Sequence, residues 1–274
     1  MVEFNLPPTR RGDTSKWRKN CQKMRDYLQF YFEGQGLSLA YEASMRFDPL
    51  QLNSEQAQTF GCDPDYSVWL MQPNHVDTSN PELRELRTAG GHVHVSFDID
   101  ENGTPPGVED VTRVVKTLDL YLGVPSVLFD KDTTRRAFYG KAGAFRPKSY
   151  GVEYRVLSGF WFSDPLYSDW VYESVHDAFR WLRNRRPERL DETLEQHSQD
   201  IQAAINNADK ALAERLVDNF GLRKLGHNAD IAIDDEVAQL RANLRNAIRP
   251  DQQVFMALGD GYEAQAQAVG RGLR

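Results

Sequence analysis

Four short segments of the chain alternate polar and apolar residues, which is the pattern of β-strands with one buried face. They lie at residues 1–7, 37–47, 91–99 and 150–157. Because successive residues of a strand face opposite ways, each segment places its polar side chains on one side.

Apolar residues spaced three and four positions apart predict helices between and after these strands. The first runs from about residue 14 to residue 33. The others are expected at 54–58, 108–122, 167–184, 188–206, 209–219 and 234–247. Strands separated by long helical connections indicate a mixed α and β arrangement rather than an all-β barrel.

The pattern changes after Pro165, where the remaining chain becomes rich in Ala, Gln, Glu, Arg and Leu. We therefore expect three parts: a core over residues 1–165, a helical region over 166–258 and a flexible tail over 259–274.

Two of the predicted strands carry side chains suited to metal and anion binding. His92 and His94 share one face of the first, and Glu153 and Arg155 share one face of the second. Imidazole and carboxylate bind divalent cations, while guanidinium recognises phosphate or carboxylate through two hydrogen bonds. Either pair alone is more often an ordinary strand face. The prediction of a metal and anion site therefore depends on both pairs occurring in one chain.

Four segments resemble the phage phiEco32-like carboxylate–amine ligases, type 2, of the glutamine synthetase and glutamate–cysteine ligase superfamily. They are VEFNLPP at 2–8, FGCDPDY at 60–66, RTAGGHVHV at 87–95 and FRPKSYGVEYRVLS at 145–158. They occur in the family's order, which is far more specific than any one motif. The resemblance implies an α+β fold, with a glutamine-synthetase-like antiparallel sheet, flanking helices and a helical C-terminal region.

The resemblance also implies the activity and cofactors. It implies an ATP-dependent ligase that forms an amide or isopeptide bond through an acyl phosphate, with Mg²⁺ or Mn²⁺ as cofactor. The partners would be small-molecule or peptide carboxylate and amine substrates.

The roles of individual residues follow from the same resemblance. The implied metal ligands are Glu3, His92 and Glu153. The implied catalytic residues are Arg155, at the transferring phosphoryl group or substrate carboxylate, and His94, at the nucleotide phosphates. Cofactor binding would further involve Gly90, Gly91, Arg146 and Lys148, the glycines through close backbone approach and the basic residues through charge.

The family normally has a further strand upstream of residues 1–7, with an Asp-Pro-Glu segment whose Glu is another metal ligand. A sheet without that strand exposes an edge, so we expect residues 1–274 alone to self-associate or to need a complementing upstream segment. Turnover by this chain alone would mean that another carboxylate, such as Glu42, takes the vacant ligand position.

Two alternatives stay open. The first is a catalytically inactive homologue that acts as a nucleotide-binding or structural phage protein. The second is a metal-dependent cupin, which requires a glutamate soon after His94, a later histidine and an all-strand barrel.

Composition limits the other classes of function. The chain has 40 acidic and 33 basic residues, and this formal net charge of -7 disfavours binding to the nucleic-acid backbone. No apolar run approaches the roughly 20 residues that span a bilayer, which predicts a cytoplasmic protein. Cys21 and Cys62 are the only cysteines, too few for a disulfide scaffold, and we expect both to be reduced.

Overall fold

The computed structural model describes residues 2–55, 65–74, 83–97 and 104–225. The chain divides into two compact units, one formed by Met1–Cys21 and Ala40–His227 and the other by Gln22–Leu39 and Asn228–Arg274. The sheets, the helices after residue 107 and the predicted site residues belong to the first unit. The predicted division at residue 165 stays a prediction.

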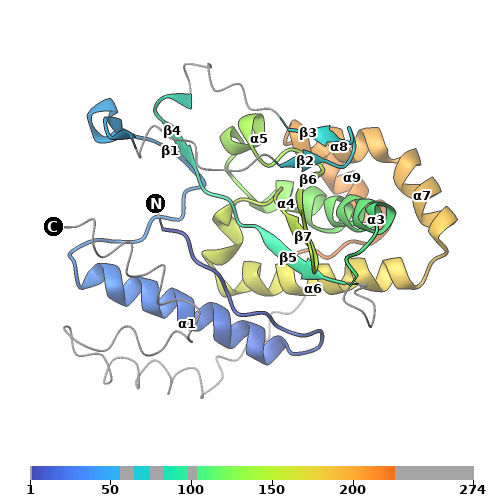
Figure 1. Cartoon of the computed structure of the whole chain (residues 1–274), viewed down its shortest axis with the longest axis horizontal. Coiled ribbons are helices and arrows are strands. Elements are labelled where there is room, and N and C mark those ends of the chain that lie inside the picture. The colour runs from blue at the N-terminus through green and yellow to red at the C-terminus, as the bar shows by residue number, and fades with distance from the viewer. Residues whose placement is uncertain (1, 56–64, 75–82, 98–103, 226–274) are drawn as a thin grey trace. The chain divides into compact units, whose positions relative to one another are not determined.

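A five-stranded antiparallel sheet carries both motif strands, in the order β3-β2-β6-β7-β5 (Figure 1). Its strands are β2 (Tyr66–Ser67), β3 (Gln72–Pro73), β5 (Val93–Ser96), β6 (Ala144–Lys148) and β7 (Gly151–Tyr154). A separate antiparallel pair joins β1 (Ser44–Arg46) to β4 (Leu86–Thr88). Strand β7 lies between β6 and the edge strand β5, so the Glu153 segment is paired on both sides.

Most of the described chain is helical. Its α-helices are α1 (Thr14–Glu33), α3 (Val108–Leu118), α4 (Val124–Phe129), α5 (Thr134–Phe138), α6 (Pro165–Arg183), α7 (Pro187–Gln196), α8 (Ser198–Asn206) and α9 (Lys210–Phe220). Three further turns are the 3₁₀ turns η1 (Pro49–Leu52) and η4 (Gly159–Phe162) and the π-helical turn η3 (Asp119–Gly123). None of the helices in the described ranges is both long and apolar enough to cross a membrane.

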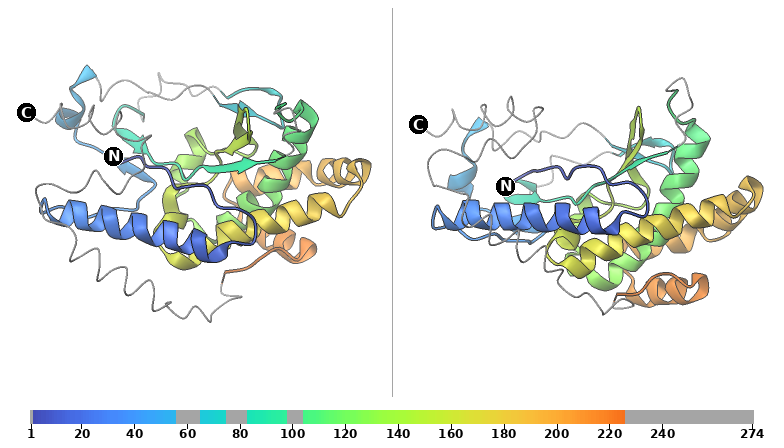
Figure 2. Two further views of the ribbon diagram at one scale, coloured as in Figure 1. Left: turned by 60° about the horizontal axis from the view of Figure 1, so that its bottom comes forward. Right: turned by 90° about the horizontal axis from the view of Figure 1, so that it is seen from below.

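Helices pack against one face of the sheet and leave the other for the motif side chains. The apolar stripe of α3, which includes Val111, Val115 and Leu118, is buried, and α3 packs against β7. Helix α6 packs in turn against α3 and η3 (Figure 2). Asp164 caps the start of α6 by accepting a hydrogen bond from the Leu166 amide, and Pro165 occupies the first turn, where its missing N–H costs nothing.

The α+β fold class, with antiparallel sheets and several helices, is confirmed. The helices expected at 14–33, 167–184 and 209–219 are present, within about two residues of their expected ends. The helix expected at 108–122 is α3, which ends at Leu118 and continues as the π-helical turn η3. The helix expected at 188–206 is two helices, α7 and α8, because the backbone leaves helical geometry at His197. The all-strand barrel that a cupin requires is not the fold of the described residues.

The strand expected at 1–7 is wrong, because residues 2–10 have no regular secondary structure. Pro7 and Pro8 lack the N–H groups that a ladder needs. The apolar side of the segment is used in packing instead, since the ring of Phe4 lies 4.6 Å from that of Phe162.

The strand expected at 37–47 shortens to β1, and those at 91–99 and 150–157 shorten to β5 and β7. The helix expected at 234–247, the tail at 259–274, Cys62 and most of the helix expected at 54–58 lie outside the described residues. Cys21 is buried and makes no disulfide.

Candidate active site

The register of the sheet places the predicted polar residues on one face. Glu153 in β7 lies opposite His94 in β5 on one side and opposite Arg146 in β6 on the other. Residues directly opposite each other on paired strands point to the same face. His92, Lys148 and Arg155 lie two positions from these three residues and therefore share that face.

The carboxylate of Glu153 is the centre of this group. Its Oε1 lies 3.1 Å from Nδ1 of His92 and forms a short ion pair with Arg155 Nη1. Its Oε2 lies 3.0 Å from Nζ of Lys148 and 3.4 Å from Nη1 of Arg146. Glu153 is only 3% exposed, so these charged contacts are largely withdrawn from water. We call Glu153, Arg155, Arg146, Lys148 and His92 the Glu153 cluster.

Two more side chains, Asp65 and Arg135, form hydrogen bonds with Arg155 and the end of β7. Asp65 accepts a hydrogen bond from Arg155 Nε at 3.2 Å. Arg135, which is 3% exposed, donates from its Nη atoms to the backbone carbonyls of Arg155 and Val156 at 3.0 and 2.9 Å. In the described ranges Arg135 has no carboxylate within ion-pair distance.

The pKa values of Glu153, His92 and His94 are all lowered, as expected beside several cations. Burial alone would raise the pKa of Glu153, but hydrogen bonds from His92 and Lys148 and the charge of Arg155 outweigh it and lower the pKa. Burial lowers the pKa values of His92 and His94, and nearby arginines act in the same direction. Both imidazoles are therefore neutral at pH 7, and Glu153 is ionised.

Among the described residues of this region, positive charges outnumber negative ones. Arg135, Arg146, Lys148 and Arg155 contribute four positive charges, against two negative charges from Glu153 and Asp65. Burial lowers the pKa of Arg135 to about 10, which still leaves it charged at neutral pH. Arg135 and Arg155 are buried and the side chains of Arg146 and Lys148 are partly exposed, so the arrangement suits a phosphate-bearing or carboxylate-bearing ligand that reaches the cluster from solvent.

A family model described as phage phiEco32-like COOH.NH2 ligase-type 2 matches residues 84–248, which include β4, β5, β6 and β7. The chain belongs to this family. Membership makes it a carbon–nitrogen ligase by family, in agreement with the resemblance seen in its motifs. No curated protein and no solved structure matches the chain.

Gly90 and Gly91, the two glycines of the segment at 87–95, allow close packing of neighbouring side chains. A side chain at Gly90 would collide with the His92 ring, and one at Gly91 would collide with the Ser158 carbonyl and the Trp161 indole. Gly91 also accepts a hydrogen bond from Trp161 Nε1 at 2.9 Å. The close approach that requires glycine is therefore to neighbouring protein atoms, and cofactor binding by Gly90 and Gly91 stays a prediction.

Two of the three predicted metal ligands lie together. His92 and Glu153 are adjacent, whereas Glu3 is exposed, and the described part of the chain contains no group of three His, Cys, Asp or Glu arranged to hold a metal ion. Imidazole beside carboxylate is a suitable donor pair for Mg²⁺ or Mn²⁺. Because cations already engage both Glu153 oxygens, the pair fits a metal only when an anion draws Arg146 and Lys148 away.

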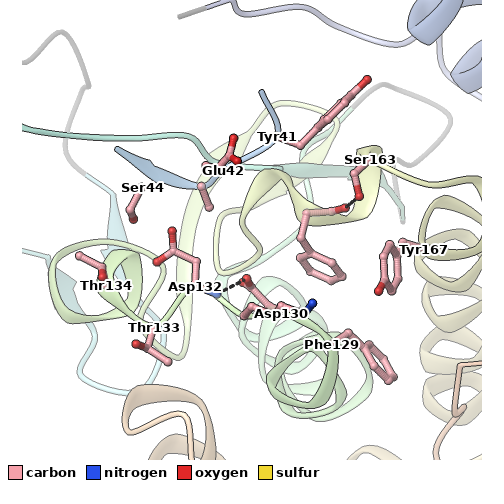
Figure 3. Close-up of a pocket in the computed structure, with 13 residues that line it drawn as sticks. Tyr41, Glu42, Ser44, Phe129, Asp130, Asp132, Thr133, Thr134, Ser163 and Tyr167 are labelled. Atoms are coloured by element: carbon pink, nitrogen blue, oxygen red, sulfur yellow. Dashed lines mark hydrogen bonds between the residues drawn. The ribbon is translucent and has the colours of Figure 1, made fainter. Parts of the chain in front are cut away.

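Glu42, the other candidate ligand, lies in a different place. It lines a pocket of about 510 Å³ with Ser44 and Asp132, while Phe129 and Tyr167 lie on the other side of the pocket (Figure 3). Asp132 accepts a hydrogen bond from the Arg135 amide, and the Arg135 side chain donates to the Arg155 carbonyl.

Sequence reasoning missed three residues of the site. Asp65 lies inside a segment that resembles the family, at 60–66, but had no assigned role. Tyr150 lies inside a motif but had no assigned role, yet its hydroxyl lies 2.6 Å from Nδ1 of His94. Arg135 stood in a loop-rich stretch, and only its place directly before a second arginine set it apart.

Proposed function

We propose that this ligase is ATP-dependent and joins a carboxylate to an amine through an acyl phosphate. The observation that carries the proposal is the excess of positive charge at the Glu153 cluster, on one face of a sheet in a COOH.NH2 ligase family. Polyphosphate and carboxylate are the anions that this reaction must hold side by side. The acid and amine would be small molecules or peptides.

In the proposed reaction, a carboxylate oxygen of the acid attacks the γ-phosphorus of ATP and ADP leaves. The amine then attacks the acyl carbon, loses a proton, and inorganic phosphate leaves. Arg155 would stabilise the charge on the phosphoryl group in transfer, because its guanidinium is already oriented by Glu153 and Asp65. Preorganised charges of this kind need no rearrangement during the reaction.

Arg146 and Lys148 would exchange Glu153 Oε2 for phosphate oxygens when the nucleotide binds. That exchange frees a carboxylate oxygen beside His92, so His92 and Glu153 would hold one Mg²⁺ or Mn²⁺ ion. Such an ion would supply further neutralisation of the phosphate charge. Glu3 as a third ligand stays part of the proposal, without a contact that supports it.

His94 would act as a hydrogen-bond donor to a phosphate oxygen. Burial raises the pKa of Tyr150, so its hydroxyl remains protonated and can donate to Nδ1 of the neutral His94 ring. The ring proton then lies on Nε2, which leaves a donor for the ligand.

The experiment supplies ATP, Mg²⁺ and a mixture of amino acids and short peptides, and measures ADP, phosphate and new amide products. We expect phosphate and amide in equal amounts. Arg155→Lys should lower both by about a hundredfold, whereas Arg189→Lys, at an exposed surface pair with Glu192, should change neither.

A nucleotide-binding homologue without turnover is the second candidate, favoured by the presence of only two adjacent metal ligands in the described residues. It predicts nucleotide binding with no phosphate release. Since β5 forms one edge of the described sheet, self-association or pairing with an upstream segment remains part of the proposal as well.

A further inference from the structure

A second buried carboxylate, Asp119, lies on the helix-covered face of the sheet. It is fully buried at the start of the π-helical turn η3. It accepts hydrogen bonds from Trp69 Nε1 at 2.6 Å, from the Tyr154 hydroxyl at 2.8 Å and from the Gly143 amide. A buried carboxylate with three donors is fixed in position, because any movement leaves a polar group unsatisfied.

Two glycines make room for this arrangement. Gly143 has a φ of +74°, and a side chain on it would press into the Trp69 indole, with Val68 Cγ1 only 3.0 Å away. A Cβ at Gly123 would lie 2.7 Å from the Tyr154 hydroxyl. The backbone around Asp119 is therefore shaped to admit both aromatic side chains.

The two aromatic partners belong to the two segments that form the Asp65–Arg155 ion pair. Tyr154 lies between Glu153 and Arg155 in sequence and points to the opposite face of the sheet. Trp69 follows Asp65 by four residues, in the turn between β2 and β3. Asp119 thus binds, from behind, the same two segments whose front-face side chains meet.

Burying a carboxylate costs free energy of folding, so stability alone does not explain a carboxylate at this position. Neutral groups of similar shape can replace buried charges at little cost, and sometimes with a gain in stability. What the carboxylate supplies is simultaneous acceptance from Trp69, Tyr154 and Gly143, which an amide side chain does not match because half of it donates.

We propose that Asp119 is a positioning residue of this ligase, which fixes the β2–β3 turn against β7 so that Asp65 meets Arg155. The catalytic consequence rests on the proposed function. The structural consequence, the orientation of the Arg155 guanidinium, does not.

The test follows the Arg155 Nε–H signal by ¹H–¹⁵N NMR, assigned by its loss in Arg155→Lys. In the wild type, donation to Asp65 should protect this proton from exchange with water. We expect Asp119→Asn to increase its exchange rate at least tenfold, to the rate found in Asp65→Asn. The double variant should exchange no faster than Asp65→Asn, because both changes break the same contact.

Thr117→Val is the matched control. Thr117 is fully buried two residues earlier, in α3, and donates to the Arg113 carbonyl at 2.7 Å, so its loss removes a buried hydrogen bond without touching the aromatic pair. It should leave the Arg155 signal unchanged. If Asp119→Asn does not fold, Trp69→Phe removes one donor only and should give the same increase in exchange.

Turnover gives the second readout. Asp119→Asn should lower kcat for phosphate release at least tenfold with less than a threefold change in KM for ATP. In a chain that already carries Asp65→Asn, adding Asp119→Asn should cause no further loss of kcat. An unchanged Arg155 signal in a folded Asp119→Asn or Trp69→Phe variant would overturn the inference. An altered signal without any phosphate release in the wild type would overturn the proposed function and leave the positioning role standing.

Discussion

A buried carboxylate lies at each face of β7: Glu153, in the strand itself, and Asp119, in η3 behind the strand. Their surroundings shift the two pKa values in opposite directions. On one face, cationic donors outweigh burial and lower the pKa of Glu153. On the other, burial outweighs the neutral donors Trp69, Tyr154 and Gly143 and raises the pKa of Asp119 to about 7.

The contrast shows that burial alone does not determine what a carboxylate does. Charged partners keep Glu153 ionised, and in the proposed function Arg146 and Lys148 would leave it for phosphate oxygens while a metal ion takes their place. Neutral partners leave Asp119 with no ligand to exchange, so it suits fixing the strand in place. The following predictions test this contrast, from the largest expected effect to the smallest.

Arg155→Lys should lower phosphate release by about a hundredfold, since it removes one preorganised charge contact from the transfer step. The lysine keeps the charge but cannot contact Glu153 and Asp65 at once. Rates measured at saturating ATP test this. A loss below threefold would place the transfer step elsewhere in the molecule.

The pH dependence of stability should have opposite signs for the two carboxylates. Asp119 has a raised pKa in the folded state, so the stability it contributes is complete below about pH 4 and is lost as the pH rises towards 7. At about 1.4 kcal/mol per pKa unit, the loss is up to about 4 kcal/mol.

Glu153 has a lowered pKa, so its contribution is present above about pH 4.3 and is lost as the pH falls through the lowered value. The check is the free energy of unfolding from denaturant titrations between about pH 2 and 8, as wild type minus Asp119→Asn and wild type minus Glu153→Gln. Parallel curves for the two differences would contradict the contrast. Arg136, whose charge lowers the pKa of Asp119, stays intact in both variants.

Metal binding at His92 and Glu153 should depend on the nucleotide. Mn²⁺ or Mg²⁺ should raise the melting temperature only with ATP or a non-hydrolysable analogue, because the free site holds Arg146 and Lys148 against Glu153. At a hundredfold excess over Kd, the linkage contributes about 2.7 kcal/mol. His92→Ala should abolish the shift in thermal melts, and His197→Ala, outside the cluster, should retain it.

The smallest effect is expected for Tyr150→Phe. Loss of one hydrogen bond to His94 should raise the KM for ATP by about three- to tenfold, with stability nearly unchanged, because the hydroxyl lies at the end of an exposed turn. Long-range ¹⁵N NMR of the His94 ring gives the tautomer directly. An unaltered tautomer together with an unaltered KM would remove Tyr150 from the site.

Part of the site could be predicted from the sequence because strand alternation is a local property. The pattern around His94 and Glu153 predicts which side chains share a face, and the register of β5, β6 and β7 brings them opposite each other. The helices around it followed in the same way from their apolar spacing.

The remainder depends on contacts between distant segments. Asp65 and Arg155 are 90 positions apart, and no local pattern in either segment predicts that they meet. The strand expected at 1–7 failed for a related reason: alternation predicts a buried side, but a strand also needs a hydrogen-bonded neighbour.

The most direct test of the central claim follows oxygen from the acid to the phosphate. The wild-type chain is given ATP, Mg²⁺ and a mixture of amino acids and short peptides labelled with ¹⁸O in their carboxyl groups, and the released phosphate is analysed by ³¹P NMR. Attack of the carboxylate on the γ-phosphorus predicts one ¹⁸O atom in each phosphate, with about a hundredfold less labelled phosphate from Arg155→Lys in the same time. Phosphate without ¹⁸O, or no phosphate at all, would contradict the account.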